Sequence, residues 1–411
     1  MDCPVGIDDL NVYGSTCSID IETIACARGR SAKVLQAVQF LRRSVTPPSE
    51  DAVTLAVNAA KPVVDAAGPG SFKLLIVATE SGVDYGKPLS AYVHQLLGLS
   101  PACRNFEVKY ACHGGTTGIQ LAASWIRSHA APGAKALVVM TDLARQHFGD
   151  PAELSAGSGA VAVSIAADPL VLCIEDATGY ACREVYDVAR PTTTGEWGDA
   201  VLSLAAYLDL LEMAWEGYQQ QAGWDAPLDE RFRYMLYHTP LVSLIQQAHE
   251  ILLRAGREDL SPSQINDSFD RMVAPALGYP RELANIYSGS VYSKLASLVD
   301  QASDLESGTR IGIFSYGSGS CAELFGGVIA EGARQRVARH RIGARLARRR
   351  ALDLSDYERF VRETDVMLTS CHYEPPPFDV GSELERGSQN GEPRLVLSRI
   401  CNYHREYGWT A

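Results

Sequence analysis

The sequence lacks several features that mark metal, redox or membrane proteins. It contains ten cysteines among 411 residues, yet no C-x-x-C pair occurs, which argues against a zinc or dithiol redox centre. No apolar stretch approaches the roughly 18 residues of a membrane-spanning helix. The N-terminal segment MDCPVGIDDL has neither the basic nor the apolar part of a secretion signal. We therefore expect a cytoplasmic protein with reduced thiols, no bound metal and no membrane association.

An excess of positive charge is also missing. The formal net charge is −12 at pH 7, which argues against general nucleic-acid binding. The charge is uneven, because residues 334–350 (RQRVARHRIGARLARRR) are rich in arginine and contain no acid. Such a segment is either a docking patch for an acidic partner or a solvated helix face.

Short apolar runs alternate with helical patterns along the whole chain. Buried strands are expected over residues 74–79, 106–110, 136–141, 157–167, 311–320 and 324–330. Helices are expected over residues 50–67, 88–97, 117–129, 200–221, 241–256 and 287–301. This alternation predicts a layered α/β fold, and the similar content of the two halves is compatible with a duplicated unit.

The strongest local signal is the segment YACHGGTTG, in which Cys112 lies between a short strand and a helix. A thiol at a helix N-terminus faces unpaired N–H groups and the positive end of the dipole, which lowers its pKa and favours the nucleophilic thiolate. Gly114 and Gly115 let the backbone approach a ligand and offer N–H groups to an oxyanion. The alternative is a buried structural cysteine beside a flexible turn.

Glu80 and His238 also follow apolar strands directly. Glu80 comes after LLIVAT, where open α/β sheets place ligands, and partial burial would raise its pKa and make it a better base. His238 precedes Thr-Pro, in a turn from which an imidazole polarises a carbonyl or shuttles a proton. A surface glutamate and a structural histidine are the alternatives, and Asp84 competes for the role of the base.

The common placement of these residues is the argument for a shared site. Strand ends converge in a layered α/β fold, so we expect Cys112, Glu80 and His238 to meet at one pocket. A cysteine and a histidine alone would also suggest a cysteine hydrolase.

Five segments, in this order and at these separations, resemble 3-hydroxy-3-methylglutaryl-coenzyme A synthases of the thiolase superfamily. They are ATESGVD with Glu80, KYACHGGTTGIQLA with Cys112, LYHTP with His238, NIYSGSVYSKLASL from Asn285 and FSYGSGSCAELF around Ser315. The resemblance covers essentially the whole chain. It implies a duplicated five-layered (αβαβα) thiolase-like fold, a homodimer, and an acyltransferase that forms carbon–carbon bonds.

The same resemblance assigns roles and boundaries. It makes Glu80, Cys112 and His238 catalytic, and it assigns substrate binding to Asn285, Tyr287, Gly317 and Ser318. We place one thiolase-like half at residues 1–170, with Glu80 and Cys112. The other half, residues 171–411, contains His238, Asn285 and Ser318.

Further details resemble the subfamily that introduces β-branches into polyketides. That subfamily takes acyl groups from the phosphopantetheine arms of acyl carrier proteins rather than from coenzyme A. The details are Gly114-Gly115-Thr116, GSGAVAV (157–163), the stretch 184–212 and the tail NYHREYGW (402–409). Leu241-Val242-Ser243 follow the His-Thr-Pro without a nearby basic residue, which puts a coenzyme A phosphate contact in doubt and favours a carrier substrate.

Carrier proteins are acidic, so a carrier-dependent enzyme needs a basic docking surface. The candidates near the N-terminus are Arg28, Arg30, Lys33, Arg42 and Arg43. The segment 334–350 is a second candidate.

The resemblance implies a reaction without a bound cofactor. Cys112 takes an acetyl group from a donor carrier, and Glu80 removes a proton from its methyl group. The carbanion adds to the β-ketone of an acceptor-bound β-ketoacyl thioester, which His238 polarises, and water releases a 3-hydroxy-3-methylglutaryl-type β-branched product. Three alternatives stay open: a mevalonate-pathway synthase acting on acetyl-CoA and acetoacetyl-CoA, a thiolase-fold transferase or thioesterase, and a non-enzymatic scaffold.

Overall fold

The computed structural model describes residues 4–144, 147–376 and 393–410. Within these residues the largest sheet contains, in spatial order, β11 (Tyr234–Tyr237), β12 (Arg310–Gly317), β13 (Cys321–Ile329), β8 (Leu172–Cys182), β1 (Val5–Tyr13), β7 (Gly159–Ala167), β6 (Lys135–Asp142), β4 (Phe72–Ala78) and β5 (Arg104–Val108). Smaller sheets are built from β2 (Cys17–Asp20), β3 (Arg42–Val45) and β14 (Arg350–Ala351), from β15 (His372–Tyr373), β16 (Leu395–Cys401) and β17 (His404–Trp409), and from β9 (Val188–Ala189) with β10 (Trp197–Gly198).

The helices connect these strands and cover their faces. In the first half they are α1 (Ile21–Ala27), α2 (Ala32–Val38), α3 (Ala52–Ala67), α4 (Leu89–Leu96) and α5 (Gly114–Arg127). In the second half they are α6 (Ala200–Ala222), α7 (Leu228–Arg231), α8 (Val242–Gly256), α9 (Pro262–Met272), α10 (Gly278–Leu283), α11 (Ser290–Gln301), α12 (Ala333–Ala338), α13 (Ile342–Ala347) and α14 (Leu354–Thr369).

The two halves of the large sheet repeat one strand arrangement. In the first half β4 runs parallel to β6, and β6, β7 and β1 follow in antiparallel order. In the second half β11 runs parallel to β12, and β12, β13 and β8 follow in antiparallel order. The halves meet where β1 pairs antiparallel with β8, at Gly6–Cys173 and Ile7–Leu172. The matching order and direction confirm the predicted duplication.

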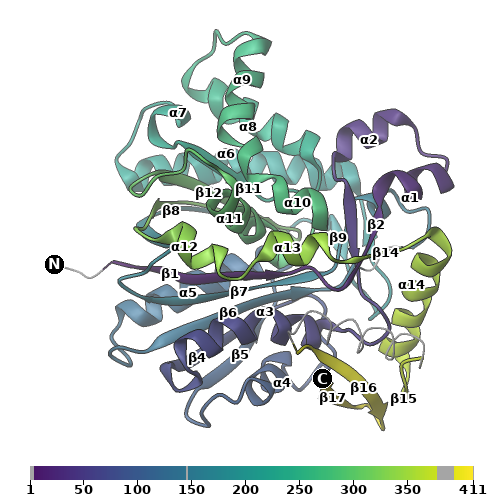
Figure 1. Ribbon diagram of the computed structural model, residues 1–411. Helices are drawn as coiled ribbons and strands as arrows, with labels where there is room; N and C mark the ends of the chain where they lie inside the picture. The colour runs from purple at the N-terminus through teal and green to yellow at the C-terminus, as the bar shows by residue number, and fades with distance from the viewer. Residues whose placement is uncertain (1–3, 145–146, 377–392, 411) are drawn as a thin grey trace.

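The core clusters define five layers. One cluster joins α5 and α11 to strands of both halves, so these two helices lie between the two parts of the sheet. A second packs α3 against the other face of β4, β6 and β7, and a third packs α6 and α8 against β11, β12 and β13. Figure 1 shows α6, α8 and α9 at one end of the molecule and α3 and α4 toward the other. Strands buried on both faces read as continuous apolar runs, as LLIVAT does.

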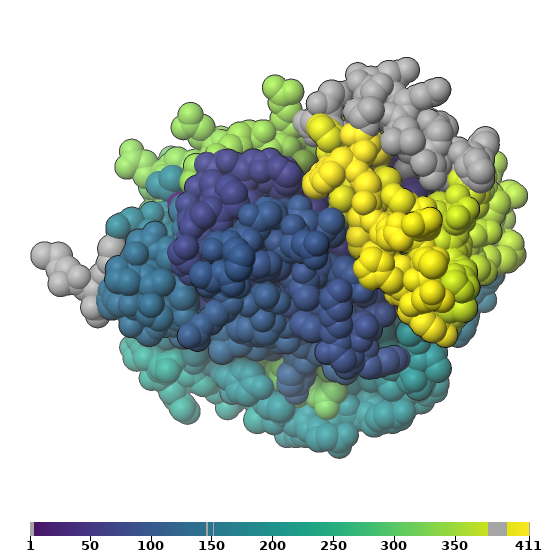
Figure 2. Space-filling view, turned by 90° about the horizontal axis from the view of Figure 1, so that it is seen from below, coloured from purple at the N-terminus to yellow at the C-terminus, as the bar shows by residue number. Residues whose placement is uncertain are grey.

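The end of the chain returns to the first half. The hairpin β16–β17 packs beside α3, where the side-chain amide of Asn58 bonds both the N–H and the carbonyl of Leu395 at 2.8 and 3.0 Å. Figure 2 shows this segment, in yellow, lying against the N-terminal part of the molecule. The boundary that we place near residue 170 stays a prediction.

The arginine-rich segment 334–350 packs partly on β1. Arg336 lies 3.1 Å from Asp8, and Arg339 forms an ion pair with Asp9. Both aspartates are buried. These arginines therefore neutralise buried carboxylates. No helix in the described residues is long and apolar enough to cross a membrane.

Candidate active site

Cys112 lies at the predicted junction between a strand and a helix. β5 ends at Val108, and α5 begins at Gly114, directly after its N-cap residue His113. Gly115 packs so closely on the turn before α11 that a Cβ there would lie 2.5 Å from the carbonyl oxygen of Ser288. The glycine therefore lets the start of the helix touch the segment from the second half.

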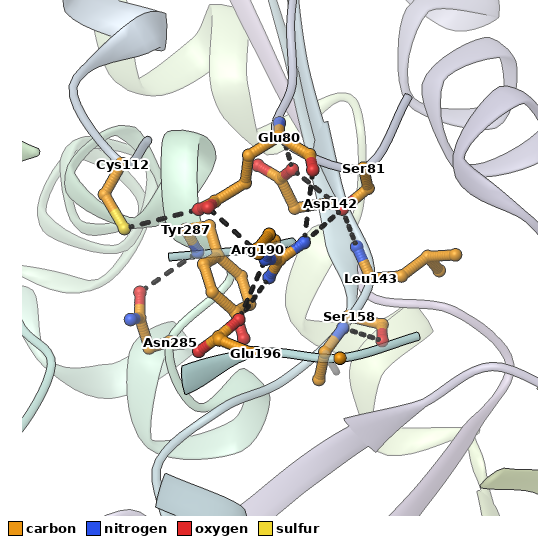
Figure 3. A network of polar contacts seen from close by, with 12 residues as sticks. Glu80, Ser81, Cys112, Asp142, Leu143, Ser158, Arg190, Glu196, Asn285 and Tyr287 are labelled. Carbon is orange, nitrogen blue, oxygen red and sulfur yellow. Dashed lines mark hydrogen bonds and ion pairs between the residues drawn. The ribbon is translucent and has the colours of Figure 1, made fainter. Parts of the chain in front are cut away.

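Glu80 and Cys112 face each other. The Sγ of Cys112 lies 3.8 Å from Oε1 of Glu80, within reach of a weak S–H hydrogen bond (Figure 3). Burial raises the pKa of Glu80 to about 8; the charge of Arg190 opposes this shift, and the nearby Asp142 adds to it. The direction of this pKa shift agrees with the sequence prediction, and a carboxyl group with a pKa near neutral is suited to act as a base.

The expected activation of the thiol by a helix N-terminus is wrong. Burial raises the pKa of Cys112 well above its usual range, and the neighbouring charges of Glu80 and Asp142 raise it further. The dipole of α5 should lower the pKa of the thiol, but this helix begins two residues after Cys112. Desolvation and the two carboxylates therefore have the larger effect on that pKa. The resting thiol is therefore protonated, with the carboxyl group of Glu80 beside it.

Asp142 fixes the loop that presents Glu80, and the sequence argument missed it. Its Oδ1 accepts hydrogen bonds from the N–H of Glu80 at 2.9 Å and from the hydroxyl of Ser81 at 3.0 Å. Its Oδ2 accepts one from the N–H of Ser288 at 3.1 Å, so one carboxylate joins the loop to the turn before α11. Asp142 is the last residue of the apolar strand β6. An acidic residue at the end of an apolar run was the pattern that indicated Glu80, and the same pattern indicates Asp142.

Arg190 and Glu196 were also missed. Arg190 Nε lies 3.4 Å from Oε2 of Glu80 and donates to Oε2 of Glu196 at 2.8 Å. Both residues come from the connection between β9 and β10, which enters the site from the second half (Figure 3). The segment has no periodic pattern, so nothing in the sequence placed it beside Glu80.

His238 lies at the end of β11, as predicted, but its ring makes no hydrogen bond to Cys112 or Glu80 in the described part of the chain. The backbone N–H of His238 donates a hydrogen bond to the carbonyl oxygen of Phe314 at 2.8 Å. The residue after Cys112 is His113, and its ring nitrogen Nδ1 lies 3.1 Å from the hydroxyl oxygen of Ser315. Ser315 follows Phe314 on β12. Adjacent positions of β12 therefore hold His238 and the cysteine turn at the same end of the sheet.

The imidazole of His238 is uncharged at neutral pH. Burial lowers its pKa to about 3, and the positive charge of Lys294 acts in the same direction. Lys294 is itself buried; its Nζ donates to the carbonyl of Tyr237 at 2.6 Å and to the hydroxyl of Thr239.

The four expected substrate-binding residues surround the same turns. Asn285 Oδ1 accepts a hydrogen bond from the N–H of Tyr287 at 3.0 Å. The guanidinium of Arg190 lies 4.7 Å from the centre of the Tyr287 ring. A Cβ on Gly317 would lie 2.7 Å from the carbonyl oxygen of Tyr110, so β12 also packs tightly on the cysteine turn. Ser318 follows on the half-exposed turn after β12. Their roles in binding remain predictions.

Of the five basic residues predicted to form a docking surface near the N-terminus, only some are exposed in the structure. Arg43 is buried and donates to the carbonyl of Glu153 at 2.7 Å, so it presents no charge to a partner. Arg28 is mostly buried and pairs with the carboxylates of Glu153 and Glu358. The partly exposed cations at these positions are Arg30, Lys33 and Arg42; Arg42 also pairs with Asp20 and Glu282.

No group of three or more His, Cys, Asp or Glu side chains in the described ranges is arranged to hold a metal ion.

Comparison with known proteins now identifies the family. Models of hydroxymethylglutaryl-coenzyme A synthase match the chain at residues 5–169 for the N-terminal part and 258–387 for the C-terminal part. The chain belongs to the hydroxymethylglutaryl-coenzyme A synthase family. The predicted family, its thiolase-like fold and its class of enzyme, a condensing enzyme that forms carbon–carbon bonds, are confirmed.

Three similarities place this synthase within the family. It is 37% identical to the polyketide biosynthesis 3-hydroxy-3-methylglutaryl-ACP synthase PksG of Bacillus subtilis, over 98% of this chain and 99% of that protein. It is 31% identical to the hydroxymethylglutaryl-CoA synthase of Enterococcus faecalis, over 88% and 92% of the two chains. The solved HMG synthase of the curacin biosynthetic pathway, in complex with an acetyl donor-ACP, matches it with a TM-score of 0.92 and 36% identity, over 99% and 100% of the two chains.

Proposed function

We propose that this synthase joins an acetyl group, carried on Cys112 from a donor acyl carrier protein, to a β-ketoacyl thioester on an acceptor carrier protein. The product is a 3-hydroxy-3-methylglutaryl-type β-branched intermediate of polyketide biosynthesis. The observation that carries the chemistry is the contact between Cys112 and Glu80, a nucleophile and a base of suitable pKa 3.8 Å apart.

In the first half-reaction Glu80 accepts the thiol proton of Cys112, and the thiolate attacks the acetyl thioester. The bond from the carbonyl carbon to the carrier sulfur breaks as the bond to Sγ forms, so the thioester is conserved. The departing phosphopantetheine thiolate takes the proton that Glu80 had accepted, so Glu80 is a carboxylate again before the second half-reaction. N–H groups at the start of α5 and near Ser318 are candidates to hold the oxyanion.

In the second half-reaction Glu80 removes a proton from the acetyl methyl group. The carbanion adds to the β-ketone of the acceptor, and the new alkoxide takes up the proton that Glu80 removed from the methyl group. His238 is neutral and therefore serves as a hydrogen-bond donor to this oxygen rather than as a strong acid. Asn285 positions the acceptor thioester, and hydrolysis of the Cys112 thioester frees the product as a carboxylate.

Three observations favour a carrier protein over coenzyme A as the source of the acyl groups. The 37% identical relative is an ACP synthase by name, and the similar curacin enzyme was solved with a donor-ACP. Leu241-Val242-Ser243, after His238, also offer no basic side chain for a coenzyme A phosphate. The alternative, a mevalonate-pathway synthase acting on acetyl-CoA and acetoacetyl-CoA, is supported by the 31% identical relative.

Intact-protein mass spectrometry tests the proposal. The wild type is mixed with acetyl-carrier protein or, separately, with acetyl-coenzyme A, and the acetyl adduct is followed in time. We expect one adduct, formed faster from the carrier and absent in Cys112→Ala. The matched control is Cys173→Ala, which removes a half-buried cysteine of β8 and should load like the wild type.

Equal or faster loading from coenzyme A would favour the mevalonate-pathway alternative. An adduct that forms but does not condense with an acetoacetyl carrier would indicate a transferase or thioesterase. An adduct that survives Cys112→Ala would overturn the assignment of the nucleophile.

A further inference from the structure

The connection between β9 and β10 is anchored beside the candidate active site. At its base, Asp187 Oδ1 accepts a hydrogen bond from the N–H of Gly319 at 2.8 Å, and Oδ2 accepts one from the hydroxyl of Tyr316 at 3.0 Å. Asp187 is fully buried. The segment is therefore anchored to the end of β12, and from there it places Arg190 and Glu196 beside Glu80.

Arg190 is fixed by contacts on several sides. Its Nη1 donates to the carbonyl oxygen of Glu80 at 3.3 Å and to the hydroxyl of Ser81 at 3.2 Å, while its planar face covers the ring of Tyr287. The Nη2 lies 2.8 Å from Oε2 of Glu196 without hydrogen-bond alignment, so this second contact is one of charge. The Arg190 side chain is 12% exposed, so water screens its charge little.

The charges around Glu80 come from several elements. Cys112 faces it from the turn before α5 and Asp142 from the end of β6. Arg190 and Glu196 face it from the β9–β10 connection. One guanidinium is thus placed between carboxylates that repel each other. Removing a positive or a negative charge from this group must shift the proton affinity of Glu80 in opposite directions.

We propose that Arg190 and Glu196 are a pair of positioning residues that set the basicity of Glu80 for the condensation step. Arg190 favours the carboxylate form of Glu80 through its charge and fixes the loop through the carbonyl of that residue. Glu196 opposes part of this charge and orients the guanidinium. This inference rests on the proposed function, because it assigns Glu80 the role of the base.

The test is the pH dependence of condensation by enzyme that has already been acetylated on Cys112. Acetoacetyl-carrier protein is added, and the rate in a single turnover is measured between pH 6 and pH 10. In Arg190→Met the acid limb of the profile should move to higher pH by about one unit or more, the usual effect of losing a close opposite charge. In Glu196→Gln it should move to lower pH. Arg190→Lys, which keeps the charge, should leave the limb near its wild-type position at a reduced rate.

A purely structural role would lower the rates without moving the limbs in opposite directions. Shifts of the same sign in Arg190→Met and Glu196→Gln, or no shift in either, would overturn the inference. Because Glu196→Gln preserves shape, it keeps the test valid if Arg190→Met fails to fold. The matched control is Arg254→Met, which breaks a surface ion pair on α8 and should not move the limb. A wild type that never condenses would instead contradict the proposed function itself.

Discussion

Burial shifts the pKa of two side chains of the candidate active site in opposite directions. Burial raises the pKa of Glu80 to about 8 and lowers the pKa of His238 to about 3, because both lie in surroundings that disfavour charge. The sequence placed both residues correctly at strand ends. It also predicted an activated Cys112, which was wrong, since the number of carboxylates that would face the thiol cannot be read from spacing alone.

Lys294 should make the stability of the protein depend on pH. Burial lowers its pKa well below the ordinary 10.5, so the folded state releases a proton that the unfolded state binds. Unfolding therefore takes up a proton between the lowered pKa and 10.5, and stability rises with pH across that window, by up to about 1.4 kcal/mol per pH unit. Denaturant unfolding of the wild type and Lys294→Met at pH 7, 8 and 9 should give the wild type the steeper rise.

Other titratable groups contribute equally to the pH dependence of unfolding in both proteins. The difference between the two slopes of stability against pH therefore reports on Lys294 alone. Lys61→Met, which replaces an exposed lysine of α3, serves as the control and should keep the wild-type slope. Identical slopes in the wild type and Lys294→Met would show that Lys294 keeps its ordinary pKa in the folded state.

Regular elements were predictable from the sequence, whereas the irregular connections were not. Apolar runs placed β4 and β6 within one or two residues and β12 within three, because strands buried on both faces leave that pattern. Helix α5 begins at Gly114, three residues before the predicted start, since two glycines weaken the helical signal. The β9–β10 connection supplies Arg190 and Glu196 and has no such pattern, so only the structure shows that it reaches Glu80.

The close packing of β12 against the cysteine turn predicts a strong effect of Gly317→Ala. The new Cβ would lie 2.7 Å from the carbonyl oxygen of Tyr110 and 2.8 Å from the backbone nitrogen of His113. Relief requires the strand and the turn to move apart, which should cost about 1–3 kcal/mol and slow acetylation of Cys112. Thermal unfolding and mass spectrometry of the adduct measure both effects.

Gly70→Ala is the matched control, because a Cβ there meets no atom within 4 Å. It should leave the unfolding midpoint and the acetylation rate unchanged. Gly317→Ala protein with wild-type stability and acetylation would show that the turn and the strand are not in rigid contact.

The whole molecule is closed by contacts between segments far apart in the sequence. Arg336 and Arg339 cover acids of β1, and the β16–β17 hairpin covers the start of α3. These pairings could not be predicted from the sequence, because an ion pair leaves no periodic pattern. The sequence therefore left two interpretations of the basic segment 334–350, a docking patch or a solvated helix face. Arg336 and Arg339 belong to neither, because they pair with buried aspartates.

The hairpin should stabilise the first half through one buried ion pair. Arg405 Nη1 lies 2.9 Å from Oδ2 of Asp51, a fully buried residue whose other oxygen caps α3 by accepting from the N–H of Thr54. Arg405→Leu leaves this carboxylate without its cation, which should cost about 3 kcal/mol in the free energy of unfolding. Arg399, on the same hairpin, pairs with Glu406 in solvent, and Arg399→Leu should leave the unfolding midpoint unchanged. Equal effects of the two substitutions would mean that the hairpin does not hold α3, and that the first half is stable without the end of the chain.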